Sequence, residues 1–124
     1  MPIPLPAALS PTDMEELESL DGATHLRMPA GQVLVYREHR SPGVFVVVTG
    51  RIEVPEERGH RRPSPHRVEA LPGRPVLIPG PDSVEEPFSE TWAVGETADV
   101  LYLPRTLVHG NPDLKKRLRE LANG

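Results

Sequence analysis

The chain has 124 residues, which suits one domain with one hydrophobic core, and its formal net charge is −4. This negative balance argues against nucleic acid as a partner, and the lack of cysteine excludes disulfides, thiol catalysis and thiolate metal sites. Sixteen prolines and ten glycines predict short elements with frequent turns, and they argue against a helical bundle because proline breaks helix interiors.

The N-terminal part of the chain predicts an extended lead followed by a helix. Residues 1–9 form a proline-rich lead, whose first residues we expect to be disordered. Ser10-Pro11-Thr12-Asp13 is typical of a helix start, because the serine caps, the proline fits the first helical position and Asp13 completes a capping box. We expect this helix to end at Asp21-Gly22. Its apolar positions at helical spacing are Met14, Leu17 and Leu20.

The middle of the chain predicts strands separated by turns. Turns that contain glycine are expected at Pro29-Ala30-Gly31, Ser41-Pro42-Gly43 and Thr49-Gly50. Residues 44–48 are apolar throughout, which predicts a strand buried on both faces. Many short strands with regular turn signals favour a β-roll or barrel. The predicted strands are residues 33–36, 44–48, 51–54, 68–71, 76–78, 90–94 and 100–103.

Residues 55–66 contain no aliphatic side chain and predict a solvated, mobile loop. Two histidines, His60 and His66, flank Arg61 and Arg62 within it, where they could meet a metal ion by accident. The loop interpretation is favoured, and no metal site or cofactor is predicted. Beyond the strands, Asn111-Pro112-Asp113 predicts the start of a closing helix. Its apolar stripe at i, i+4 and i+7 consists of Leu114, Leu118 and Leu121.

Two stretches resemble the cyclic nucleotide-binding domain. LRMPAGQVLVYREHRSPGVFVVVTGRIEV, residues 26–54, resembles the turn, buried strand and Gly-Arg pair that open the family's β-roll. ADVLYLPR, residues 98–105, resembles the family's last strand and the start of its following helix, with the next helix starting at Asn111. The resemblance implies one domain, residues 10–124: a mainly β double-stranded β-helix, or jelly-roll, with flanking N- and C-terminal helices. A cupin would show similar strands, but its His-x-His metal motif is absent.

The family's ligand cassette is altered in this sequence. The resemblance implies an arginine paired with the cyclic phosphate, amides at a short helix start that cradle it, and a Gly-Glu pair whose glutamate binds the ribose. Phe88 stands at the arginine position, and an apolar ring cannot pair with phosphate. Pro75-Val76-Leu77-Ile78 replaces the Gly-Glu pair. Since a buried phosphate without partners is very unfavourable, cyclic nucleotide binding is not expected.

Two further sets of residues are candidates for function. If the roll binds any ligand, the candidate pocket residues are Arg74, Ile78, Phe88 and Ser89, with Arg74 as the one nearby cation. Phe88 is either a core aromatic that fills the ligand's space, which we favour, or the wall of a new apolar pocket.

For an interface, the candidates are Trp92, Leu114, Leu118 and Leu121. Relatives that bind DNA carry a long dimer helix and a helix-turn-helix after the roll. Because this chain stops at Gly124, we expect both to be absent and apolar surface to be left uncovered.

The sequence carries no pattern typical of catalysis, since it has no nucleophile elbow, no phosphate-binding loop and only sequence-adjacent carboxylate pairs. No apolar run is long enough to span a membrane, and no signal peptide is apparent. We therefore expect a non-catalytic regulatory or adaptor module of a bacterial cytoplasm, which acts on a protein partner or a second copy. The alternative is a sensor of a nucleotide or an apolar small molecule, and a cupin-type enzyme is third.

Charged residues also gather by sign along the sequence. A basic group consists of Arg58, Arg61, Arg62 and Arg67, and an acidic group of Asp82, Glu85, Glu86 and Glu90. They form either two solvated surfaces or complementary docking surfaces.

Overall fold

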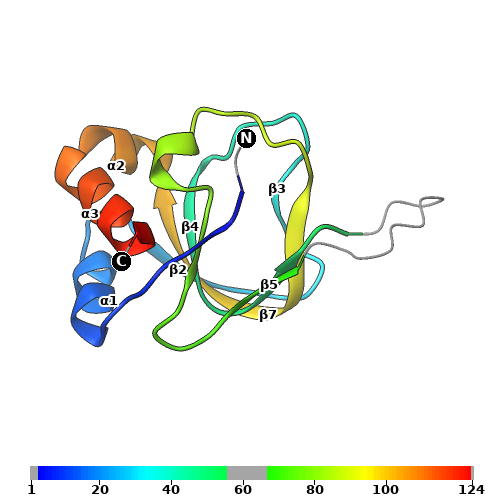
Figure 1. Ribbon diagram of the computed structural model, residues 1–124, viewed down its shortest axis with the longest axis horizontal. Helices are drawn as coiled ribbons and strands as arrows, with labels where there is room; N and C mark the ends of the chain where they lie inside the picture. Colours follow the sequence, from blue (N-terminus) through cyan, green and yellow to red (C-terminus); the bar gives the residue numbers. More distant parts are fainter. Residues whose placement is uncertain (1–2, 56–66, 124) are drawn as a thin grey trace.

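The computed structural model describes residues 3–55 and 67–123, and the predicted loop lies outside these ranges except for Pro55. The chain forms an antiparallel β-roll with its three α-helices gathered on one side (Figure 1). The mainly β roll with flanking helices that the sequence predicts is confirmed. The elements are β1 Leu5–Pro6, α1 Pro11–Glu18, β2 Thr24–Met28, β3 Val33–Val35, β4 Gly43–Glu53, β5 Arg67–Ala70, β6 Val76–Ile78, the short 3-10 helix η1 Pro81–Ser83, β7 Trp92–Pro104, α2 Arg105–Gly110 and α3 Pro112–Asn123.

Two long strands, β4 and β7, form the central pair of the roll. They pair antiparallel from Gly43 opposite Pro104 to Glu53 opposite Ala93, with register shifts in the middle. The sequence predicted two separate strands in each of these regions, and the turn expected at Thr49-Gly50 is wrong. Gly50 instead bends a continuous strand: its φ is +118°, and a Cβ there would come within 2.7 Å of Ala98.

Strand β4 separates two hydrophobic clusters, because successive side chains point to opposite faces. Phe45 and Val47 belong to the interior of the roll, and Val44 and Val46 face the helices. The predicted burial on both faces is confirmed. The roll core comprises Leu34, Val35, Phe45, Val47, Ile52, Ala70, Val76, Ile78, Phe88, Trp92, Val94, Ala98 and Val100. The helix-side core comprises Leu9, Leu17, Val44, Val46, Leu77, Val84, Leu101, Leu103, Val108, Leu114, Leu118 and Leu121.

The proline-rich lead is ordered from Ile3 onward and crosses the molecule to α1 (Figure 1). Leu5 pairs with Leu77 of β6, and the amide of Ala8 donates to the carbonyl of Leu121 at 3.1 Å. Because β1 is an edge strand, it tolerates Pro6. The lead from Leu5 to Leu9 therefore packs against the domain predicted for residues 10–124, and the expectation of disorder does not hold for these residues.

The helices begin where the sequence places them. Ser10 and Asp13 form the predicted capping box of α1, but the helix ends at Glu18, before the expected stop at Asp21-Gly22. Asn111 accepts a hydrogen bond from the amide of Leu114 at 3.1 Å and so caps the start of α3. Asp13, in the first turn of α1, also forms an ion pair with Arg117 of α3, which links these two helices.

Candidate functional site

The segment of residues 79–91 connects β6 to β7, where the resemblance implies a ligand cassette. In Figure 1 this segment runs along the upper edge of the roll, from the helices toward β3. It contains η1 and the buried side chains of Val84 and Phe88, together with the buried prolines Pro79 and Pro81. Val84 belongs to the helix-side core and Phe88 to the roll core, so the segment is anchored in both layers.

Phe88 lies inside the roll with only 1% of its surface exposed. Its backbone is held on both sides by the turn after β3: the Phe88 amide donates to the His39 carbonyl at 3.0 Å, and the Glu38 amide donates to the Phe88 carbonyl at 2.7 Å. Glu38 adopts a left-handed φ of 65° in this arrangement. The position that the resemblance assigns to a phosphate-binding arginine therefore holds a core aromatic ring.

The other residues of the predicted ligand pocket are divided between the core and the surface. Ile78 is fully buried in the roll core, as is Phe88. Arg74 and Ser89 are both exposed, the first in the turn before β6 and the second after η1. The structure thus brings the two apolar candidates together and leaves the two polar candidates outside the roll.

The short helix η1 is a feature that sequence reasoning missed. The resemblance implies that amides at a short helix start cradle the phosphate, and η1 lies in this segment. Its first residue, Pro81, has no amide hydrogen, and the amide of Ser83 donates to the Gly80 carbonyl at 3.0 Å. Asp82 adds a negative charge to the first turn, where an anion needs positive potential. This helix start is poorly suited to bind an anion.

Glu85 is the centre of a charge network that fastens the segment to the rest of the molecule. Its carboxylate lies 2.7 Å from Nε2 of His109 and accepts a hydrogen bond from Arg40 at 2.9 Å. Arg105 lies 3.8 Å away. The hydrogen bond with His109, followed by that from Arg40, holds the pKa of Glu85 below its usual range. Sequence reasoning missed this network, because its members come from three distant parts of the chain.

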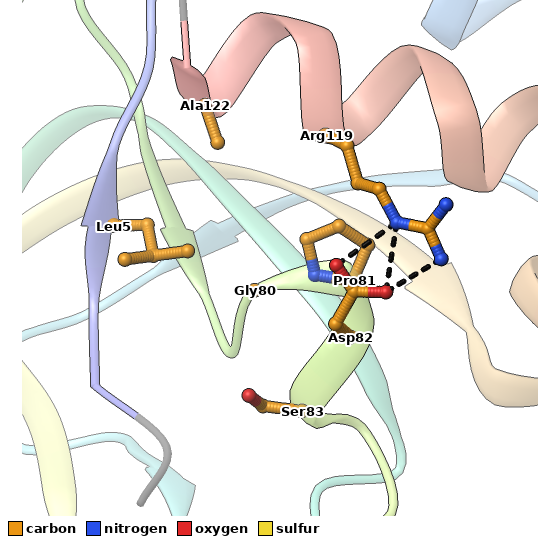
Figure 2. A pocket seen from close by; sticks show the side chains of 7 residues that line it. All are labelled: Leu5, Gly80, Pro81, Asp82, Ser83, Arg119 and Ala122. Carbon is orange, nitrogen blue, oxygen red and sulfur yellow. Dashed lines mark hydrogen bonds and ion pairs between the residues drawn. The ribbon is translucent and has the colours of Figure 1, made fainter.

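Asp82 makes a second connection, from η1 to α3 (Figure 2). Nε of Arg119 donates to both carboxylate oxygens, at 2.8 and 2.9 Å, and this bonding lowers the pKa of Asp82. The pair borders a hollow of about 80 Å³, with Leu5 and Ala122 in its lining. This volume equals that of two or three water molecules and is too small for a nucleotide.

The predicted interface residues all lie in the interior. Trp92 is 6% exposed and belongs to the roll core. The α3 stripe, Leu114, Leu118 and Leu121, belongs to the helix-side core, where it meets residues of α1, α2 and the N-terminal lead. These three leucines pack within the fold, so the apolar surface that we expected to be left uncovered does not lie at this stripe. The lead and α1 supply cover that the helical pattern of α3 alone could not reveal.

An open apolar pocket, hereafter the α1 pocket, lies between α1, the middle of β4 and the turn before β6. Its volume is about 230 Å³. It was not predicted, because its residues come from separate segments that only the fold brings together. The lining residues are Leu9, Pro11, Met14, Val48, Thr49, Pro72, Gly73 and Pro75.

In residues 3–55 and 67–123, no three His, Asp or Glu side chains lie close enough to hold a metal ion. Over the same ranges, no helix has the length and apolar character needed to cross a membrane. His60 and His66 lie outside the described residues, so the interpretation of their segment stays a prediction.

Comparison with known proteins supports the roll. No protein-family model matches the sequence, and no curated protein matches it significantly. Among solved structures, the crystal structure of the catabolite activator protein of Thermus thermophilus is similar, with a TM-score of 0.52 and 21% sequence identity. The match covers 90% of this chain and 56% of that chain. This likeness supports the cyclic nucleotide-binding-like β-roll fold that the sequence resemblance implied.

Proposed function

We propose that this chain is a non-catalytic regulatory or adaptor module that acts through protein–protein contact and does not bind a cyclic nucleotide. The observation that carries the proposal is the burial of Phe88 in the roll core, at the position where the resemblance implies the phosphate-binding arginine. A phosphate in that place would lose its hydration and meet an aromatic ring, which is strongly unfavourable.

The charges around the segment of residues 79–91 support the same proposal. Arg40, Arg105 and Arg119 are the cations nearest to it in the ion pairs described above, and each faces a carboxylate of the segment itself. A ligand phosphate would have to displace Glu85 or Asp82 from these partners. The segment is therefore held in place by the chain's own groups, without any need for an anionic ligand.

Calorimetric titration with cyclic AMP and cyclic GMP tests this proposal directly. We expect no binding at physiological nucleotide levels, and a dissociation constant in the low micromolar range would overturn the proposal. Thermal unfolding gives an independent measurement, because a ligand at a hundred times its dissociation constant stabilises the native state by about 2.7 kcal/mol. We expect the melting temperature to be unchanged by either nucleotide.

A second candidate function is a sensor of an apolar small molecule, and the α1 pocket favours it. Seven of its eight lining residues carry no polar side-chain group, and its volume of about 230 Å³ could accept a small ligand. This candidate predicts that a small apolar compound raises the melting temperature in proportion to the logarithm of its concentration. The adaptor proposal predicts no such shift. We place either function in the bacterial cytoplasm.

A further inference from the structure

The α1 pocket continues into exposed apolar surface on one side. Leu71 is 55% exposed and precedes Pro72 and Gly73, which line the pocket. In the described ranges the only other large apolar side chains with comparable exposure are Ile3 and Tyr36. The pocket and Leu71 together leave a patch of apolar surface in contact with water, an arrangement typical of interaction surfaces.

The rims of this patch carry opposite charges. Pro11 and Met14 of α1 face the pocket, so the residues four positions later, Glu15 and Glu18, lie on the same face of the helix. Both glutamates are exposed and form the acidic rim.

Across the pocket, the exposed Arg74 lies between Gly73 and Pro75, both of which line the pocket, and it forms the basic rim. Within the part of the chain that the structure describes, none of these three rim residues forms an ion pair.

We infer that two copies of this chain associate through the α1 pocket, with the basic rim of each copy against the acidic rim of the other. This inference rests on the proposed function, a module that acts by protein–protein contact, and names its surface and partner. A two-fold axis in the plane of the patch, passing through the pocket, exchanges the two rims. Each Arg74 then faces Glu15 and Glu18 of the partner copy, and symmetry makes every such contact twice.

The same two-fold arrangement covers the apolar surface. Leu71 lies on the same turn as Arg74, so it is carried toward the partner's α1, where Pro11 and Met14 form the pocket wall. Because one chain carries both complementary halves of the surface, a second copy satisfies both rims at once. The patch is small beside the roughly 800 Å² per partner of a standard interface, so the dimer is expected to be weak.

Sedimentation equilibrium at increasing protein concentration tests this inference. The wild type should show a concentration-dependent dimer. Arg74→Glu should weaken dimerisation at least tenfold, because it places like charges opposite each other twice in the symmetric interface. The triple variant Glu15→Arg, Glu18→Arg, Arg74→Glu restores opposite charges across the axis and should recover dimerisation. Arg27→Glu, a matched charge reversal at an exposed residue of β2, should leave dimerisation unchanged.

Each alternative result has a definite meaning. A strictly monomeric wild type, or a dimer that Arg74→Glu does not weaken, overturns the inference. Failure of the triple variant to recover does so as well, provided that its circular dichroism spectrum and melting temperature match those of the wild type. Should the triple variant unfold, Leu71→Asp replaces it and should also weaken dimerisation. None of these results bears on nucleotide binding, whereas micromolar binding of cyclic AMP overturns the proposed function and leaves the dimer intact.

Discussion

The segment of residues 79–91 and the rims of the α1 pocket use acidic residues in opposite ways. In the first region, Asp82 and Glu85 pair with arginines of the same chain, and Phe88 is buried beneath the surface. In the second, Glu15 and Glu18 are exposed beside an open apolar pocket. Charge alone therefore does not locate an interaction surface on this molecule. The α1 pocket offers a partner what the segment of residues 79–91 does not: charged side chains without an ion pair in the described chain, next to apolar side chains that are exposed to water.

Among the tests that compare these two regions, removal of the Phe88 ring should have the largest effect on stability. Phe88→Ala leaves a cavity in the roll core and should lower the free energy of unfolding by about 3–5 kcal/mol. Chemical denaturation measures this loss. Ser89→Ala, at the exposed neighbouring position, is the control and should change stability by less than about 0.5 kcal/mol. A small effect at Phe88 would mean that the ring is not a core residue, and the segment would then be open to a ligand.

The overall fold was easier to predict from the sequence than the course of its long strands. Caps such as Ser10 and Asn111 carry local chemistry, so both helix starts were predicted correctly. The bend at Gly50 was predicted as a turn. A glycine with positive φ occurs both in turns and in bends within a strand, and only the pairing with β7 shows that β4 continues through it. Strand β2 was missed since its apolar positions, Leu26 and Met28, are only two and are separated by an exposed arginine.

The candidate sites were harder to predict from the sequence than the fold, because they depend on contacts between segments that are distant in the chain. The replacement of the phosphate-binding arginine by Phe88 could be predicted, since it follows from a local alignment. The network around Glu85 joins it to His109, 24 residues away, and to Arg40, 45 residues away. No periodic pattern in the sequence indicates that these residues lie in contact. The burial of the α3 stripe under the N-terminal lead was hidden for the same reason.

A second test exchanges charged for neutral side chains in the two regions. Glu85→Gln removes the charge that faces Arg40, Arg105 and His109 and should lower the melting temperature measurably. Glu15→Gln removes a charge at the pocket rim and should leave the melting temperature of the dilute, monomeric protein unchanged. Differential scanning calorimetry at low protein concentration compares the two. Equal shifts would show that the network around Glu85 does no more for folding than an exposed glutamate.

The pH dependence of stability should also show that Asp82 and Glu85 stabilise the fold through their ion pairs. The pKa values of Asp82 and Glu85 in the folded protein are lowered from ordinary values of 3.8 and 4.5 by their hydrogen bonds to Arg119 and to His109. A lowered pKa stabilises the folded state above the ordinary value and ceases to do so as the pH falls through the folded value. The melting temperature of the wild type should therefore fall more steeply below about pH 4.5 than that of the Asp82→Asn, Glu85→Gln variant. Parallel acid profiles of the two proteins would contradict this.

The smallest expected effect is that of salt. The pairs across the proposed two-fold interface are exposed, so their attraction is screened within about 8 Å at physiological ionic strength and within about 3 Å at 1 M salt. Raising the salt concentration should weaken dimerisation several-fold without abolishing it, because burial of Leu71 and the pocket wall does not depend on charge. In Arg74→Glu the sign should reverse, since screening relieves the repulsion between like charges. Sedimentation of the two proteins at low and high salt measures both trends. If salt acts in the same direction on the wild type and on Arg74→Glu, the two rims do not face each other.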